Sequence, residues 1–284
     1  MTLEIGNTEL DYIIPGEWSM NLLEAFYEDS GVVGRMAQVS GEVAAYGDIL
    51  HLPAMPTISV NDVGADGALT KQQLSLTEAQ LTVNKWKEAT VEIIDKAAKQ
   101  AKIDMIAAFR KDFPGPLLEQ LETDALGLYS DVTTNTQGSS TVNADEDMLT
   151  AGIAQLLALK FGRALRDPNR ATFVWHTSQW SVLKKLKILS DASLTGLPQG
   201  GAVSMKIPDI YGIPTLFSAV VVSASSARQN LLFLREAFAV GIQSNLDVRE
   251  FNTGLKLTKA VGANILYGVK TRKENRAVLF KTKA

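Results

Sequence analysis

The stretch LTEAQLTVNKWKEATVEII, residues 76–94, decides the fold class, because it alternates apolar and polar residues over an unusual length. The apolar positions on one side are Ala79, Leu81, Val83, Ala89, Val91 and Ile93. The polar positions between them are Gln80, Thr82, Asn84, Glu88, Thr90 and Glu92. A period of two residues predicts β-strand, and the fifteen residues from Ala79 to Ile93 would reach about 50 Å when extended, against a usual strand of about 5–6 residues. Lys85, Trp86 and Lys87 interrupt the pattern, and a β-bulge or a contact with a neighbouring subunit would each explain them.

The sequence before this stretch predicts a partner strand and an arm. YGDILHLP (46–53) reads as a strand, but Pro53 and Pro56 exclude it from the centre of a sheet because proline cannot donate to the ladder. NDVGADGALT (61–70) is a loop tip rich in Gly and Asp. A two-stranded ribbon of this kind is marginal alone, and its open edges invite pairing with other chains. We expect four leucines to pack in this loop: Leu50, Leu52, Leu74 and Leu76.

The N-terminal segment contains one short predicted helix in GEWSMNLLEAFYEDSGVV, residues 16–33. Its apolar residues at helical spacing are Trp18, Leu22, Leu23 and Phe26. Such a helix has little core of its own, so Trp18 and Phe26 are expected to anchor the arm on another surface.

Helices and strands are mixed in the rest of the chain. We predict helices over residues 95–112, from Pro116 to Val132 with an apolar stripe, and from a capping box at Asn143 and Glu146 to about residue 165. Residues 133–143 are predicted to form a loop. Strands are predicted at 172–175, followed by a short helix capped at Thr177 or Ser178, then near 210–222, 231–242, 266–269 and 277–280. Because no βαβ rhythm is present, the class is α+β.

The composition of the chain excludes several classes of protein. The 284 residues carry a net charge of -3 and no Cys, which excludes disulfides and thiolate metal sites and fits a reducing cytoplasm. No apolar run approaches the roughly 18–20 residues of a membrane span, and the N-terminus does not resemble a signal peptide, so we expect a soluble intracellular protein. Residues 1–30 contain acids and no Lys or Arg, whereas residues 255–284 are basic. Solvated chain ends would explain this asymmetry, and so would an acidic arm that crosses a basic face of a neighbour.

The motifs of common enzymes are missing from the sequence. GxxxxGK[ST], GxGxxG and GxSxG do not occur. Asn143, Asp145 and Asp147 have the spacing of a calcium loop, but Met148 and Ala154 stand where Gly and Glu are required. His51 and His176 have no further ligand nearby in sequence, so we expect structural roles for both. Trp175 and Trp180 are expected in the core. We therefore predict no catalytic residue, no cofactor site and no metal site.

The order of these segments resembles the major capsid proteins of tailed phages, the Hong Kong ninety-seven-type capsid fold that encapsulins also use. YGDILHLP resembles the ascending strand of the family's extended loop, and LTVNKWKEATVEIIDKAAKQ its return strand. The stripe from Leu117 to Val132 is similar to the spine helix, and RATFVWHTSQWSVLKKL to a strand–helix pair of the axial domain. ILYGVKTRKENRAVLFKTK is similar to the closing strands of the peripheral domain.

The resemblance implies a division of the chain. Residues 1–45 would be an N-terminal arm, 46–82 an extended two-stranded loop, 83–135 with 251–284 a peripheral domain with the spine helix, and 136–250 an axial domain. It also implies a non-enzymatic virion protein that self-assembles into hexamers and pentamers of an icosahedral head around double-stranded DNA. We expect subunit contacts at ten residues: Trp18, Phe26, Leu50, Leu52, Lys71, Leu74, Leu76, Lys85, Trp86 and Lys87.

Partners follow from the same resemblance. The long N-terminal scaffolding region of some relatives is not recognised here, so scaffolding is expected from a separate protein or from a segment already removed, together with a portal and a possible decoration protein. Packaged DNA would lie near the subunit without specific binding, membranes are not expected as partners, and assembly would take place in the host cytoplasm. Lys71 is the only Lys between Tyr46 and Leu81, but no motif identifies an Asn for the covalent cross-link that some relatives form. An encapsulin-like cargo compartment and an oligomeric α/β enzyme are the alternatives.

Overall fold

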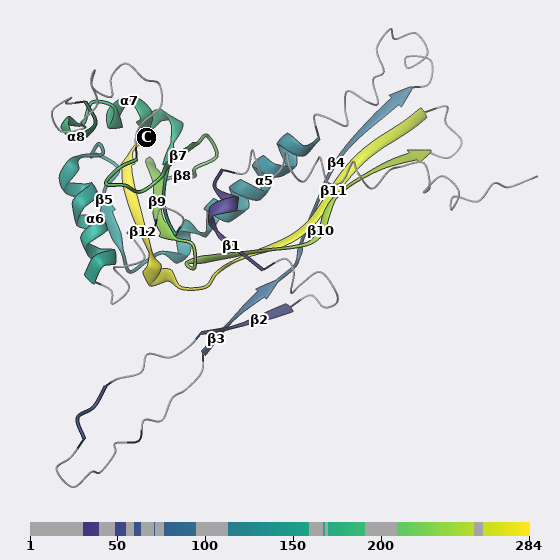
Figure 1. Cartoon of the computed structure of the whole chain (residues 1–284). Coiled ribbons are helices and arrows are strands. Elements are labelled where there is room, and N and C mark those ends of the chain that lie inside the picture. The colour runs from purple at the N-terminus through teal and green to yellow at the C-terminus, as the bar shows by residue number, and fades with distance from the viewer. Residues whose placement is uncertain are drawn as a thin grey trace, which may run out of the picture.

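The computed structural model describes ten parts of the chain: residues 31–39, 49–54, 60–63, 71, 77–94, 113–158, 167, 170–190, 209–252 and 258–284. Within them the strands form a four-stranded sheet, a six-stranded sheet and a two-stranded ribbon. Figure 1 shows the six-stranded sheet and its helices as a body, from which the four-stranded sheet and the ribbon extend in different directions. The mixture of sheets and helices is the α+β class that the sequence predicts.

The four-stranded sheet is built from unusually long strands in the order β1, β10, β11, β4. β10 (Phe238–Asn252) has 15 residues and β11 (Thr258–Thr271) has 14, and both are antiparallel neighbours. β4 (Lys85–Ile94) pairs antiparallel with β11, and the short β1 (Ala37–Gln38) pairs parallel with β10. β4 is therefore an edge strand of this sheet within the described residues.

The alternating stretch is two strands and not one ribbon. β3 (Thr77–Thr82) pairs with β2 (Ile49–Ala54), whereas β4 pairs with β11 in another sheet. The connection between β3 and β4 has two residues, 83 and 84, so the alternation keeps its phase through the change of direction. The period of two hides this break, because it reports which face each residue occupies and not which strand lies beside it.

The bulge expected at Lys85 to Lys87 is not present. The three residues pair in continuous register with Tyr267, Leu266 and Ile265. Lys85 and Lys87 keep to one face with Ala89, Val91 and Ile93, while Trp86 faces the other side. The alternation looks interrupted in the sequence only because Lys85 and Lys87 occupy positions on the more buried face of β4, where apolar residues are expected.

A helix covers that side of the sheet. α5 (Pro114–Leu126) and the 3-10 turn η2 (Gly127–Asp131) bury the predicted stripe, with Leu117, Leu121, Ala125 and Val132 each at most 3% exposed and Leu128 partly buried. The helix starts at Pro114 and not at Pro116, since both prolines fit the first turn, where backbone N–H groups have no intrahelical acceptor. The predicted helix over 95–112 lies outside the described residues.

The six-stranded sheet has the order β5, β12, β9, β6, β7, with β8 paired to β9. Its strands are β5 (Thr136–Gly138), β6 (Ala171–His176), β7 (Thr215–Ser218), β8 (Ser223–Ala224), β9 (Ala227–Leu234) and β12 (Ala277–Lys283). The strand predicted at 172–175 is confirmed in β6. Residues 136–138 lie inside the predicted loop 133–143, but they form an edge strand parallel to β12. β12 belongs to this sheet, whereas residues 251–284 were predicted to join residues 83–135.

Short helices pack on the six-stranded sheet around an aromatic core. They are α6 (Glu146–Ala158), η4 (Thr177–Gln179), α7 (Trp180–Leu183) and α8 (Lys187–Ser190). Phe173, Trp175 and Phe280 are fully buried with ring centroids 5.6–6.2 Å apart, and Gly152 of α6 leaves room for the Phe280 ring. The prediction that Trp175 is a core residue is confirmed, and Trp180 is partly buried against the same cluster.

The predicted caps of two of these helices are wrong. The side chain of Asp145, not Asn143, accepts the N–H of Met148 at 2.7 Å. The N–H of Ser178 donates to Nδ1 of His176 at 3.0 Å, so His176 caps η4 in place of Thr177 or Ser178. In each case the side chain that accepts the N–H group belongs to a residue one or two positions away from the predicted cap.

Two chain crossings join the sheets. The turn 235–237 leads from β9 to β10, and residues 272–276 lead from β11 to β12. The N–H groups of Arg272 and Lys273 donate to the carbonyl of Ala237 at 2.8 and 3.1 Å, and the carboxylate of Glu236 forms ion pairs with Arg170 and Arg276. The crossings are therefore bound to each other, and one apolar cluster continues from Leu231 and Phe233 through Phe238 to Val261.

A buried amide holds three strands of the six-stranded sheet together. Asn230 is 0% exposed, its Oδ1 accepts the N–H of His176 at 2.8 Å, and its Nδ2 donates to Thr282 Oγ1 at 2.9 Å. We expect Asn230→Ala to lower the free energy of unfolding by about 3 kcal/mol, because buried groups on β6 and β12 lose their partners. Urea unfolding measures this, with exposed Asn275→Ala as the control. A loss no larger than that of the control would contradict the role.

Candidate assembly surfaces

The outer face of β4 exposes large apolar side chains. Trp86 is 74% exposed and Ile94 is 60% exposed, and Glu88, Thr90 and Glu92 lie between them on the same face. Isolated apolar residues on a surface are ordinary, but here they lie on a strand that has no second neighbour among the described strands. The edge of β4 can therefore accept a strand of another molecule, and the face that carries Trp86 can accept an apolar segment.

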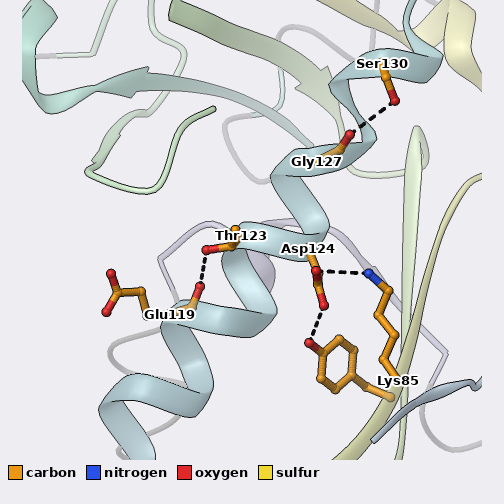
Figure 2. Close-up of polar contacts among 7 residues, drawn as sticks. Lys85, Glu119, Thr123, Asp124, Gly127 and Ser130 are labelled. Atoms are coloured by element: carbon orange, nitrogen blue, oxygen red, sulfur yellow. Dashed lines mark hydrogen bonds and ion pairs between the residues drawn. The ribbon is translucent and has the colours of Figure 1, made fainter. Parts of the chain in front are cut away.

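The inner face of β4 is tied to the helix by a polar cluster, shown in Figure 2. Lys85 Nζ lies 3.0 Å from Asp124 Oδ1, and the Tyr267 hydroxyl donates to Asp124 Oδ2 at 2.6 Å. Burial acts to raise the pKa of Asp124, but the hydrogen bonds from Tyr267 and Lys85 and the charges of Lys85 and Lys87 outweigh it and lower that pKa. Burial, with the adjacent carboxylate, raises the pKa of Tyr267.

This cluster joins three elements of the structure. Asp124 is on α5, Lys85 on β4 and Tyr267 on β11, and Tyr267 is 0% exposed. A carboxylate that is held ionised by a lysine, and a phenol whose proton is retained, make a fixed hydrogen bond and do not exchange protons near neutral pH. The sequence marked Lys85 as an interruption of a strand and as an expected subunit contact, and it did not reveal the ion pair with Asp124, which is distant in sequence.

The two-stranded ribbon uses one face to pack on the four-stranded sheet. Leu52 and Leu81 are 4% and 0% exposed, and they cluster with Val83, Ala239 and the partly buried Leu50. Leu50 and Leu52 thus pack against their own subunit, with only Leu50 leaving part of its surface uncovered. Ile49, which is 47% exposed and was not singled out from the sequence, offers more apolar surface to a neighbour.

The other face of the ribbon is polar. His51 Nδ1 lies 3.0 Å from Glu78 Oε2, and Gln80 Nε2 donates to Glu78 Oε1 at 3.0 Å. The hydrogen bond from Gln80 and then the one from His51 lower the pKa of Glu78. Together with the cap that His176 supplies, these contacts give both histidines structural partners.

Of the remaining predicted contact residues, the structure describes two. Lys71 is exposed, and Lys87 is half-buried on the helix-facing side of β4. Trp18, Phe26, Leu74 and Leu76 lie outside the described residues. Within the described connection between β2 and β3, Val60 and Val63 are 97% and 60% exposed, although no periodicity marked them in the sequence.

The described residues offer neither a metal site nor a membrane-spanning helix. They contain no group of three or more His, Asp or Glu side chains placed to hold a metal ion. None of the described helices has both the length and the apolar character needed to cross a membrane.

Comparison with solved structures identifies the fold. A chain from Mycobacterium phage Che8 matches with a TM-score of 0.69 and 18% identity, covering 87% of this chain and 89% of that chain. A chain from the mature capsid of bacteriophage PhiM1 matches with a TM-score of 0.68 and 12% identity, covering 88% and 86%. A chain from the capsid of a native GTA particle matches with a TM-score of 0.69 and 11% identity, covering 90% of both chains.

These matches show that the chain has the fold of phage capsid subunits, so the predicted capsid fold is confirmed. Neither the known protein-family models nor the curated proteins include a match to this sequence. At 11–18% identity the likeness is one of fold.

Proposed function

We propose that this chain is the major capsid protein of a tailed phage or a related particle, and that it assembles into hexamers and pentamers of an icosahedral head around double-stranded DNA. The observation that carries the proposal is the match to capsid chains over about nine-tenths of both partners, which leaves little of this chain for another activity. The long strands and the projecting ribbon support it, since both offer surface that one subunit does not cover.

The division of labour within the subunit follows the predicted one. Residues 1–45 serve as the arm, 46–82 as the extended loop, 83–135 with 251–284 as the peripheral domain and 136–250 as the axial domain. The separate four-stranded and six-stranded sheets support two domains, with α5 as the spine helix on the former. Two strands change sides in this proposal: β12 pairs with β9, so residues 277–283 go with the axial domain, and β10 pairs with β11, so residues 238–250 go with the peripheral domain.

The contacts between subunits are assigned to two surfaces and an arm. The outer face of β4 with Trp86 is one surface, and the ribbon with Ile49 and Lys71 is the other. Both combine exposed apolar side chains with charged ones, which suits an interface that forms from soluble subunits. The arm adds Trp18 and Phe26, and Leu74 and Leu76 belong to the loop.

The proposed role is structural and involves no catalysis or cofactor. Its partners are further copies of the chain, a separate scaffolding protein, a portal and a possible decoration protein, with DNA held by proximity. The protein would be assembled in the host cytoplasm and reside in the virion.

Negative-stain electron microscopy of the purified full chain, combined with light scattering, tests the proposal. We expect capsomers or closed shells, either alone or with the scaffolding protein of the same genome. A chain that stays monomeric at every salt concentration and in the presence of that scaffold would contradict the proposed function.

Replacing Trp86 tests the surface on β4. Trp86→Glu is expected to reduce shell yield at least about tenfold, because it places a charge in an apolar contact that is repeated in every subunit. The free energy of unfolding should change by less than about 0.5 kcal/mol, since Trp86 is exposed in the subunit. Trp86→Phe is the matched control and should assemble. Equal shell yields from the two variants would exclude Trp86 from the interface.

A further inference from the structure

Gly268 lies where the backbone of the ribbon crosses the four-stranded sheet at very short range. A Cβ atom at this position would be 2.3 Å from the carbonyl oxygen of Thr82, 2.9 Å from its carbonyl carbon and 3.1 Å from the Cα of Val83. All three are backbone atoms, so no side-chain rotation could relieve the contact. Because nonbonded carbon contacts are normally about 3.5–4.0 Å, any other residue at 268 would push the chain at Thr82 away by about 1 Å or more.

This close contact lies at the point where the chain leaves the ribbon and enters the four-stranded sheet. Thr82 is the last residue of β3, and β4 begins three residues later and pairs with β11 up to the contact between Lys85 and Tyr267. Gly268 is the next residue of β11, on the face that carries Leu266 and Trp86, and its partner on β10 is Gly241. Two neighbouring positions of the sheet thus carry no side chain where the chain turns from β3 into β4.

The side chains around the crossing depend on this approach. Leu81 and Val83, on either side of Thr82, are 0% and 6% exposed and cluster with Leu52 and Ala239. If the backbone at Thr82 moved outward, these side chains would leave the sheet, and the base of the ribbon would lose its only described apolar cluster. The ribbon projects from this base in Figure 1, so a small movement at Thr82 is amplified along its length.

We infer that Gly268 is a positioning residue: the absence of a side chain there sets the direction in which the β2–β3 ribbon leaves the four-stranded sheet. The glycine acts through the backbone of Thr82 and Val83. Its consequence for assembly rests on the proposed function, because a ribbon that points elsewhere cannot reach the same site on a neighbour. The positioning itself can be measured on the free subunit.

The chain contains no Cys, so two spin labels can be attached at chosen sites. Glu78→Cys on β3 and Glu119→Cys on α5, both exposed, report the distance from the ribbon to the helix that covers the four-stranded sheet. In Gly268→Ala we expect this distance to shift or broaden by several ångströms, with far-ultraviolet circular dichroism unchanged. Gly115→Ala is the matched control, since a Cβ there meets nothing within 4 Å, and it should keep the original distance.

A second variant covers the case in which Gly268→Ala does not fold. One Gly inserted after Val83 in the Gly268→Ala chain lets Thr82 withdraw without pulling on β4, so we expect a folded subunit with a broad distance distribution. An unchanged distance in either variant would overturn the inference. Failure of both to fold would also overturn it, because the glycine would then serve the sheet and not the ribbon.

Assembly provides the second readout. If the distance changes as expected, shell yield should fall at least about tenfold relative to Gly115→Ala, since the error is repeated in every subunit. Original-sequence protein that forms no shells would count against the proposed function and leave the distance result intact. Shells of normal yield from Gly268→Ala, with a changed distance, would overturn the link between ribbon direction and assembly.

Discussion

Glu236→Gln is expected to lower the free energy of unfolding by about 3–4 kcal/mol at neutral pH, the lower part of the range for breaking a buried ion pair, because Arg276 is buried whereas the Glu236 side chain is 34% exposed and partly screened by water. Arg276 is 6% exposed, and Glu236 forms ion pairs with both Arg276 and Arg170. Burial and the positive charge of Arg170 lower the pKa of Arg276, so both disfavour its charged form, and Glu236 is the carboxylate that pairs with it. Gln keeps the size of the side chain, so the loss reports the charge.

The location makes this pair important for the whole subunit. Glu236 stands in the crossing from β9 to β10 and Arg276 in the crossing from β11 to β12, so the pair joins the two sheets. Urea unfolding of the variant measures the effect, with exposed Glu119→Gln as the control, for which we expect less than about 0.5 kcal/mol. Adding Arg276→Met to Glu236→Gln should recover part of the loss, since no unpaired charge remains buried. A loss equal to the control would show that Glu236 does not stabilise Arg276.

Asp124→Ala should have the second-largest effect, a loss of about 3 kcal/mol. The change leaves the Tyr267 hydroxyl buried without its acceptor and removes the partner of Lys85. Lys85 is 34% exposed in its side chain and can turn to water, so most of the loss comes from Tyr267. A double-mutant cycle with Tyr267→Phe measures that share, because Asp124→Ala should cost less once the hydroxyl is gone. Additive losses would contradict the coupling.

The same carboxylate predicts a dependence on pH. The pKa of Asp124 is below the ordinary value of 3.8, so the folded state favours the ionised form. Its contribution to stability is therefore complete above that value and is lost as the pH falls through the folded pKa. The stability difference between the original protein and Asp124→Asn should be constant above about pH 5 and shrink below about pH 4. A difference independent of pH down to acid unfolding would exclude the charge as its source.

Helices and strands were predictable where the periodicity of apolar residues within one segment indicates its secondary structure. The strand at β6, the stripe of α5 and the alternation in β3 and β4 each depend on residues within about ten positions of each other. The caps were missed by one or two residues, because several neighbouring side chains could accept the same N–H group. Ser225 and Ser226, in the turn between β8 and β9, have φ of 52° and 60°. Gly or Asn usually occupies such positions, so the sequence did not predict this hairpin. The buried strand β9 holds it in place.

The sequence by itself determined the α+β class, the apolar faces and a segment order that resembles phage capsid subunits, because periodicity records which side of each element faces a core. Only the tertiary structure decided that the alternating stretch divides between two sheets, that β12 pairs with β5 and β9, and that Lys85 meets Asp124. It also placed Gly268 under Thr82 and Glu236 between two arginines. These features depend on residues far apart in the chain, and the approach of two distant backbones leaves no periodic trace in either segment.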